Sequence, residues 1–456
     1  MGDDGMAESE LLTRAQCREI FERAERAARA GGAEVEILLG VNSFALTRFA
    51  NNTIHQNVAE ERRFASIRTV LGQRTARATT NRFDEASIRA TVAQALEITR
   101  AQQEDAELLP LAEPAPIDEV DHFCPSTAAA TPMERASTVA EAIRIVESAS
   151  GTAAGIFSTG DSVEAVLNSR GVFGYYFDTG AQFSITAMGA DSSGWAKASA
   201  PDRGAFDPLA LARSAAQKAA LGAHPRDLPP RRYTVILEPS AVSDLVGQMC
   251  FDFSATAVRD QRSFLTGRLG TKLFGDGINI SDDVYHPLQS GAAFDGEGVP
   301  RRRLKLVENG VVGQLARGRP AAARDGVAAT GHGFPVPNEE GEAPLNIVIE
   351  GGSQRLEDIV ASTERGILVT RFWYIREVDP YQKIMTGMTR DGTFLVEGGR
   401  IVGGVKNFRF NESLIELLNK VDAMSPAERV SGEESFDMVA PAMRVRDFNF
   451  TETTGF

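Results

Sequence analysis

One polar segment of this chain separates alternating helix and strand signals from a region of mostly strand and turn signals. Residues 224–232, HPRDLPPRR, are charged and proline-bearing, and such segments favour a connection between domains. A chain of 456 residues is also too long for a single small core. We therefore predict two domains, residues 1–225 and residues 226–456.

The first part of the chain predicts a mixed α+β domain. Thr13 and Asp84 are typical helix N-caps, and Thr131 forms a capping box with Glu134. Strand patterns lie between these helices, most clearly in EVEILLG from residue 34. The order of helix, strands, helix, loop, helix and strands is typical of the α+β class.

The second part predicts a strand-rich domain with one central helix. Residues 233–237, YTVIL, predict a strand, and Asn309–Gly310 and Gly398–Gly399 predict hairpin turns. We expect a last helix from Asn411. Apolar residues at helical spacing predict the central helix over about 240–258. They are Val242, Leu245, Val246, Met249, Phe253 and Ala257.

The charge balance argues against nucleic acid as a ligand. The formal net charge is −14, whereas affinity for a polyanion comes from clustered Lys and Arg. The densest basic run, Arg301–Arg303, abuts an apparent strand and has no interleaved aromatic residues. It therefore favours a solvated or interface-facing strand end.

Several features predict a cytoplasmic protein. Cys17, Cys124 and Cys250 lie far apart, which fits neither a disulfide framework nor a thiolate zinc site. The acidic N-terminal stretch MGDDGMAESE is unlike a signal peptide, and no apolar run is long enough to span a membrane.

Loop residues Asp121 and His122 with Cys124 form the densest ligand-type cluster, which loops commonly carry without a metal.

Four segments together resemble the TldD/PmbA family, the "modulator of DNA gyrase" proteins that assemble as cytoplasmic zinc metallopeptidases. They occur in the order of the family and cover nearly the full chain. The segments are RFANNTIHQN at 48–57, NSRGVFGYYFDTGAQFS at 168–184, FDGEGVPRRRLKLVENGVVGQL at 294–315 and TRDGTFLVEGGRIVGGVKN at 389–407. The resemblance implies the TldD/PmbA fold, with a barrel-like C-terminal domain that is a degenerate metallopeptidase domain.

The resemblance also implies where a zinc site would lie, and this chain departs from it. Catalytic members carry HExxxH on the helix after the strand corresponding to YTVIL, and a cysteine near the C-terminus completes the site. The two histidine positions fall on Gly247 and Asp252, the glutamate position falls on Gln248, and Ser431 stands in place of the cysteine. The chain therefore resembles the PmbA/TldE-like subunits that lack the zinc motif.

The chemistry of these residues also argues against a catalytic zinc site. Catalytic zinc needs about three protein ligands and an open position for the water that it activates. Gly247 offers no ligand, and the neutral amide of Gln248 cannot act as a general base. We expect no catalytic residue and no metal in this chain, with Gln248 and Asp252 bonded locally or facing a partner.

The resemblance implies a heterodimer with a TldD-like chain, which would carry the zinc and cut short or unfolded peptides. Aromatic and basic residues at 371–382 are candidate peptide or partner contacts, although an ordinary strand with core and surface residues would look the same. The candidates are Arg371, Phe372, Trp373, Tyr374 and Arg376.

Two alternative functions remain open at this point. The chain could be a hydrolase by itself, because the members of a catalytic triad converge only in the folded protein. It could also be a binding protein that acts on a regulator such as gyrase and has no peptidase role.

Overall fold

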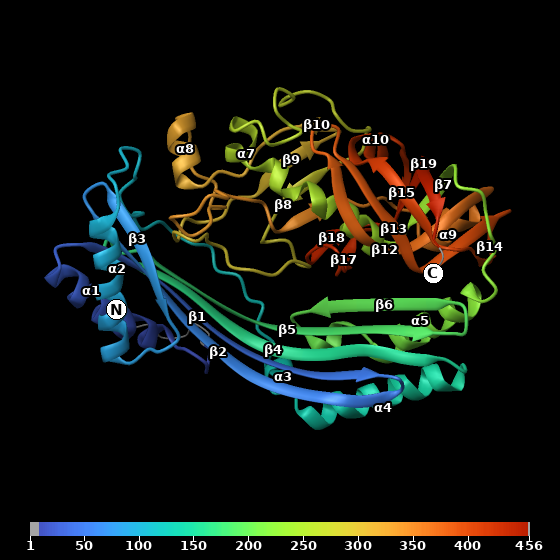
Figure 1. Cartoon of the computed structure of the whole chain (residues 1–456), viewed down its shortest axis with the longest axis horizontal. Coiled ribbons are helices and arrows are strands. Elements are labelled where there is room, and N and C mark those ends of the chain that lie inside the picture. Colours follow the sequence, from blue (N-terminus) through green and yellow to red (C-terminus); the bar gives the residue numbers. More distant parts are fainter. Residues whose placement is uncertain (1–8, 455–456) are drawn as a thin grey trace.

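The computed structural model describes residues 9–454, so residues 1–8 of the acidic N-terminal stretch lie outside the described residues. The first domain is built on one curved antiparallel sheet, in the order β3-β2-β1-β4-β5-β6 (Figure 1). Its strands are β1 (Glu34–Ala50), β2 (Thr53–Leu71), β3 (Arg74–Thr80), β4 (Thr152–Asn168), β5 (Phe173–Met188) and β6 (Ser193–Ala200).

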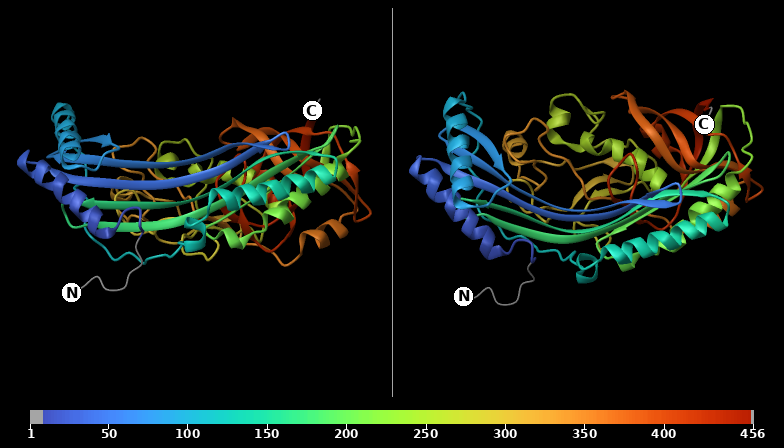
Figure 2. Two further views of the ribbon diagram at one scale, coloured as in Figure 1. Left: turned by 90° about the horizontal axis from the view of Figure 1, so that it is seen from below. Right: turned by 60° about the horizontal axis from the view of Figure 1, so that its bottom comes forward.

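Helices cover the convex face of this sheet (Figure 2). They are α1 (Arg14–Ala30), α2 (Glu85–Ala101), α3 (Pro125–Ala128), α4 (Pro132–Ser148) and α5 (Pro208–Gly222). Helices α1 and α2 bury one apolar cluster with residues such as Val41 and Val163, and α4 and α5 bury a second with Phe183. Because side chains alternate along a strand, the concave face carries the remaining residues, which are polar side chains and a smaller apolar cluster around Val166 and Tyr176.

The second domain holds two further sheets, and the α+β class predicted from the sequence is confirmed. The first runs in the order β10-β9-β8-β11-β18-β17. Its strands are β8 (Ile280–Asp282), β9 (Leu304–Glu308), β10 (Val311–Val312), β11 (Ile347–Ile349), β17 (Glu428–Val430) and β18 (Met438–Ala440). Helices α8 (Arg319–Asp325) and α9 (Leu356–Ala361) lie outside the sheets.

The second of these sheets is barrel-like, because a pairing of β12 with β13 closes the order β12-β7-β19-β15-β13 into a ring. Phe372, Phe410 and Phe448 pack inside it. Its strands are β7 (Arg232–Leu237), β12 (Arg365–Asp379), β13 (Ile384–Glu397), β14 (Arg400–Gly404), β15 (Phe408–Ser413), β16 (Val421–Met424) and β19 (Met443–Thr453).

Most local predictions hold. Thr13, Asp84 and Thr131 each accept a backbone N–H at a helix start, and both hairpins form where Asn309–Gly310 and Gly398–Gly399 adopt positive φ. The last helix, α10 (Leu414–Asn419), begins later than Asn411, because Asn411 is paired in β15. Helix α5 ends at Gly222 and β7 begins at Arg232, and the boundary at residues 225–226 stays a prediction within this connection.

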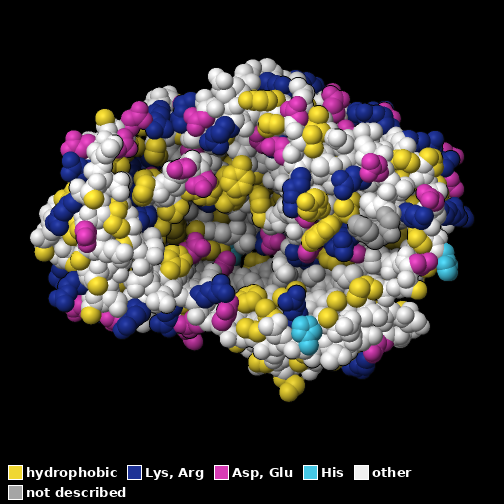
Figure 3. All heavy atoms as spheres, in the orientation of Figure 1, with side chains coloured by type: hydrophobic (Ala, Val, Ile, Leu, Met, Phe, Trp, Pro, Cys, Tyr) yellow, Lys and Arg dark blue, Asp and Glu magenta, His cyan; other side chains and the backbone are white. Residues whose placement is uncertain are grey.

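The second domain lies along the concave face of the first, and Figure 3 shows the surface hollowed between the two. At one end Arg68 of β2 contacts Glu297, and in the middle Tyr176 of β5 accepts the N–H of Gly291. At the other end Lys197 of β6 donates to the Gly432 carbonyl. Polar contacts therefore join the two domains along this face, with an apolar cluster of Val166, Val172 and Phe294 among them.

Candidate functional site

The segment that corresponds to the zinc-binding helix is not one helix, so the prediction of a helix over about 240–258 is wrong in its continuity. It consists of α6 (Pro239–Val246), a 3-10 turn η2 (Gly247–Phe253) and α7 (Ala255–Arg259). Ser254 breaks it, because its backbone is extended and its hydroxyl donates to Glu342 at 2.7 Å while capping α7. The predicted apolar residues are nevertheless buried.

Residues 431–437, here named the strap, lie over this segment at Gly247. A Cβ added to Gly247 would stand 2.5 Å from the Cβ of Ser435 in the strap. That distance is too short for any side chain to enter without displacing the strap. Ser431, at the start of the strap, is itself buried. The space that a ligating histidine would need at position 247 is therefore filled by the chain itself.

Adding a methyl group at Gly247 is expected to lower the free energy of unfolding by about 1–3 kcal/mol, because of this overlap with Ser435. The backbone of Gly247 is helical, so alanine would otherwise be neutral or stabilising. Chemical denaturation of Gly247→Ala measures the change. Gly180→Ala is the matched control, since a Cβ there meets no atom within 4 Å. Equal stability of the two variants would contradict the close packing of the strap.

Two polar side chains hold the strap in place. Asp244 accepts the N–H groups of Glu433 and Glu434 at 2.9 Å each, and burial raises the pKa of its carboxyl to about 6. The Gln248 amide donates to the Glu434 carbonyl at 2.8 Å and to the Asp244 carbonyl at 3.2 Å. Gln248 therefore acts as a donor that anchors the strap.

Asp252 is bonded to a cation that belongs to the chain. Its carboxylate lies 2.6 Å from the Lys383 ammonium, and both side chains are buried. It also accepts the N–H of Phe264. Burial raises the pKa of Asp252, and Lys383 opposes that shift. Gln248 thus has a local bond to the Asp244 carbonyl four residues before it, whereas Asp252 is held by the more distant Lys383 and Phe264.

The residues present do not fit a zinc ion. Gly247 supplies no donor, Gln248 points an N–H group at the strap, and the Asp252 carboxylate is already neutralised by Lys383. Cys250 is buried, and burial raises the pKa of its thiol well above its usual value. Within residues 9–454, no group of three or more His, Cys, Asp or Glu side chains is arranged to hold a metal.

The candidate contact residues on β12 divide between core and surface. Phe372 is fully buried among aromatic rings, so it is a core residue and not a surface contact. Arg371 is buried between the rings of Trp195 and Trp373, at 5.2 and 5.4 Å. Tyr374 is 51% exposed, and the exposed Arg376 stacks on its ring.

One group that sequence spacing did not reveal has the pattern of a catalytic triad. His332 lies 3.0 Å from the Thr330 hydroxyl and 2.9 Å from the Asp282 carboxylate. His332 and Asp282 are buried, and the Thr330 hydroxyl also bonds to the Arg317 backbone. The Thr330 hydroxyl is half-buried and already donates to the Arg317 carbonyl, so the group ties β8 to a neighbouring loop.

A second group lies on the concave face and lines a cavity of about 350 Å³. Asp178 of β5 accepts from Ser162 at 2.5 Å and from Tyr176 at 3.0 Å, and burial raises its pKa. Arg429 and Asp437 of the second domain line the same cavity. Polar residues at alternate positions of 168–184 were the sequence signal for this face.

The curved sheet and the strand ring define an α+β protein, and the side chains of residues 247–252 are not suited to hold zinc. Three family models match the chain, described as PmbA/TldA metallopeptidase domain 1 at residues 35–99, central domain at 125–222 and C-terminal domain at 230–452. The chain belongs to the PmbA/TldD metallopeptidase family.

Curated relatives share parts of the chain. A metalloprotease of Methanothermobacter thermautotrophicus is 24% identical over 282 residues, which are 58% of this chain and 60% of that relative. A metalloprotease TldD homolog of Buchnera aphidicola is 28% identical over 171 residues, 36% of this chain and 34% of that relative. The chain thus spans less than two thirds of these relatives.

Solved structures share the fold. TldE of Thermococcus kodakarensis superposes with a TM-score of 0.87 at 21% identity, covering 95% of this chain and 100% of that one. A Thermotoga maritima protein named for modulation of a DNA gyrase gives 0.83 at 20% identity, with coverages of 95% and 100%. Among residues 9–454, none of the helices combines the length and apolarity that crossing a bilayer requires.

Proposed function

We propose that this chain is the non-catalytic, metal-free subunit of a two-chain zinc peptidase. Its partner is a TldD-like chain that carries the zinc and the general base. The assembly degrades or trims short or unfolded peptides in the cytoplasm, and neither nucleic acid nor a membrane is a ligand.

The observation that carries this proposal is the way the chain fills its own metal position. Ser435 occupies the space beside Gly247, and Lys383 supplies the positive charge beside Asp252. A lysine ammonium balances a carboxylate but cannot polarise a water molecule as a metal does. The segment therefore suits a scaffold, and the chemistry is left to the partner.

The concave face suits an unfolded peptide. An extended peptide gains affinity by main-chain pairing with a strand edge, which needs no particular sequence, and β3 and β6 are the edge strands of this sheet. The cavity beside Asp178 lies between the domains and is lined by polar residues of both, among them Gln182 and Ser290. A folded protein would not enter this space, which favours short or unfolded substrates. Tyr374 and Arg376 remain candidate contacts on the outer surface.

The test is the metal content and peptidase activity of the purified chain. We expect substoichiometric zinc and no peptide cleavage by the chain alone. Cleavage should appear with a chain that co-purifies from the native host and carries HExxxH.

Three results would overturn the proposal. Stoichiometric zinc, or cleavage by the chain alone that is lost when one of its own residues is changed, would identify a stand-alone hydrolase. Co-purification of a regulator without any effect on peptide turnover would identify a binding protein.

A further inference from the structure

The two ends of one family segment, residues 389–407, meet at a cavity that the proposed function does not use. Thr389–Thr393 and Val405–Asn407 both line it, and the β5–β6 connection of the first domain closes the opposite side. Its volume is about 590 Å³, within the range of small-ligand sites. The wall is therefore built by residues far apart in sequence and from both domains.

The backbone of this wall departs from regular strand geometry at Asp391 and Gly392. The register of β12 with β13 shifts between Val369 and Arg371, so Asp391 and Gly392 leave the regular ladder, with φ of 53° and 135°. A Cβ at Gly392 would stand 2.4 Å from the Thr370 hydroxyl. Bulges of this kind occur beside functional sites, where they redirect side chains.

Of the two carboxylates on the wall, Asp391 is already neutralised by an arginine. Asp391 accepts from Arg371 at 3.0 Å and from Ser193 at 2.6 Å. Asp191 accepts the backbone N–H of His224 and lies 3.3 Å from its imidazole. The Asp391 carboxylate is therefore poorly suited to bind a cationic ligand.

One cation on the wall keeps its donors available. Arg390 is 42% exposed and lies 3.6 Å from the Asp391 carboxylate, which is beyond hydrogen-bond range. Its guanidinium stacks on the Trp373 ring at 5.2 Å, which restricts its orientation. A planar guanidinium presents paired N–H donors that match a carboxylate. Lys406 adds a second positive charge to the wall, although Asp227 pairs with it.

We propose that this cavity binds the C-terminal carboxylate of a peptide, with Arg390 as its main contact. The apolar wall residues Met188, Met388 and Val405 would cover the terminal side chain. The choice of a peptide rests on the proposed function, and the choice of a carboxylate rests on the charges of the wall. The site is separate from the zinc-equivalent segment and needs no catalytic partner.

The experiment measures binding of a fluorescent tetrapeptide to the isolated full chain, as the free acid and as the C-terminal amide. The free acid is expected to bind at least about tenfold more tightly, because the amide loses a charge-assisted pair of hydrogen bonds. Arg390→Met should abolish this difference, and Arg390→Lys should restore part of it. Arg400→Met, at an exposed turn of the same domain, is the matched control and should bind as the unchanged chain does.

Other results would overturn the inference. Equal binding of acid and amide, or an undiminished preference in Arg390→Met, would remove the carboxylate contact. Displacement of the peptide by acetate or inorganic phosphate at equal concentration would identify a small-anion site instead. Zinc in the isolated chain would contradict the proposed function but would not change the ratio of affinities for the free acid and the amide. Failure of the proposed function can therefore be distinguished from failure of the carboxylate site.

Discussion

Changing Glu297 to glutamine is expected to lower the free energy of unfolding by about 3 kcal/mol or more at pH 7, because it leaves buried arginines without a counter-charge. Arg68 lies 3.2 Å from Glu297 and Arg319 lies 2.9 Å from it. Arg68 and Glu297 are only 1% and 3% exposed. Urea denaturation of the variant measures the loss.

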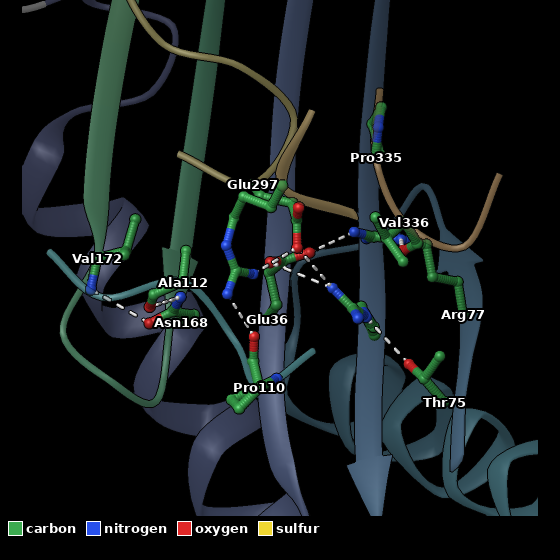
Figure 4. A network of polar contacts seen from close by, with 12 residues as sticks. Glu36, Thr75, Arg77, Pro110, Ala112, Asn168, Val172, Glu297, Pro335 and Val336 are labelled. Carbon is green, nitrogen blue, oxygen red and sulfur yellow. Dashed lines mark hydrogen bonds and ion pairs between the residues drawn. The ribbon is translucent and has the colours of Figure 1, made fainter. Parts of the chain in front are cut away.

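The effect is large because a single carboxylate, Glu36, would remain to balance all the arginines of the network. Glu36, the neighbouring carboxylate, already pairs with Arg77 and lies 3.8 Å from Arg68 (Figure 4). Losing Glu297 would leave three buried or half-buried arginines around one carboxylate. The network joins β1–β3 to the second domain, so we also expect the two domains to be less firmly attached in the variant.

A matched surface variant separates this effect from a general loss of charge. Asp358→Asn breaks the exposed pair of Asp358 with Arg355 and should change stability by less than about 1 kcal/mol. The double variant Glu297→Gln with Arg68→Met should recover part of the loss, since it removes a stranded charge. A Glu297→Gln variant as stable as Asp358→Asn would contradict the buried network.

Changing Lys383 to methionine is expected to cost about 3–5 kcal/mol, since it strands the buried Asp252 carboxylate. The loss should depend on pH. Without Lys383 the folded-state pKa of Asp252 rises further above its unfolded value, so the folded protein takes up the proton more readily. Stability lost at high pH is thus partly regained as the pH falls through that folded-state pKa. Denaturation at pH 8 and pH 5 measures the difference.

The double variant Asp252→Asn with Lys383→Met tests the same pair. It removes both charges and should be more stable than Lys383→Met alone. Lys272→Met, which breaks the exposed pair with Asp276, is the surface control and should have little effect. If Lys383→Met loses the same free energy of unfolding at pH 8 and pH 5, the loss does not come from an unpaired charge on Asp252.

Local signals along the sequence determined much of the fold. The caps at Thr13 and Thr131 and the hairpins at Asn309–Gly310 and Gly398–Gly399 depend on residues within one or two turns of each other, so a linear pattern reveals them. The resemblance of the family segments also predicted which positions correspond to a zinc site, and that correspondence stays a prediction. The chemical unsuitability of Gly247 and Gln248 for zinc could be argued from residue type alone.

Contacts between distant segments decided the rest. The helix over 240–258 breaks because Ser254 meets Glu342, and Phe372 is a core residue because the strand ring closes around it. Periodicity records neither contact, since it describes one element at a time.

What the sequence determined by itself, then, is which chemistry the residues at 247 and 248 are unable to perform. What the tertiary structure decided is what fills their place: Ser435 beside Gly247 and Lys383 beside Asp252. The physical reason is that a side chain carries its donors and charge wherever it lies, whereas its burial and its partner exist only once the chain has folded.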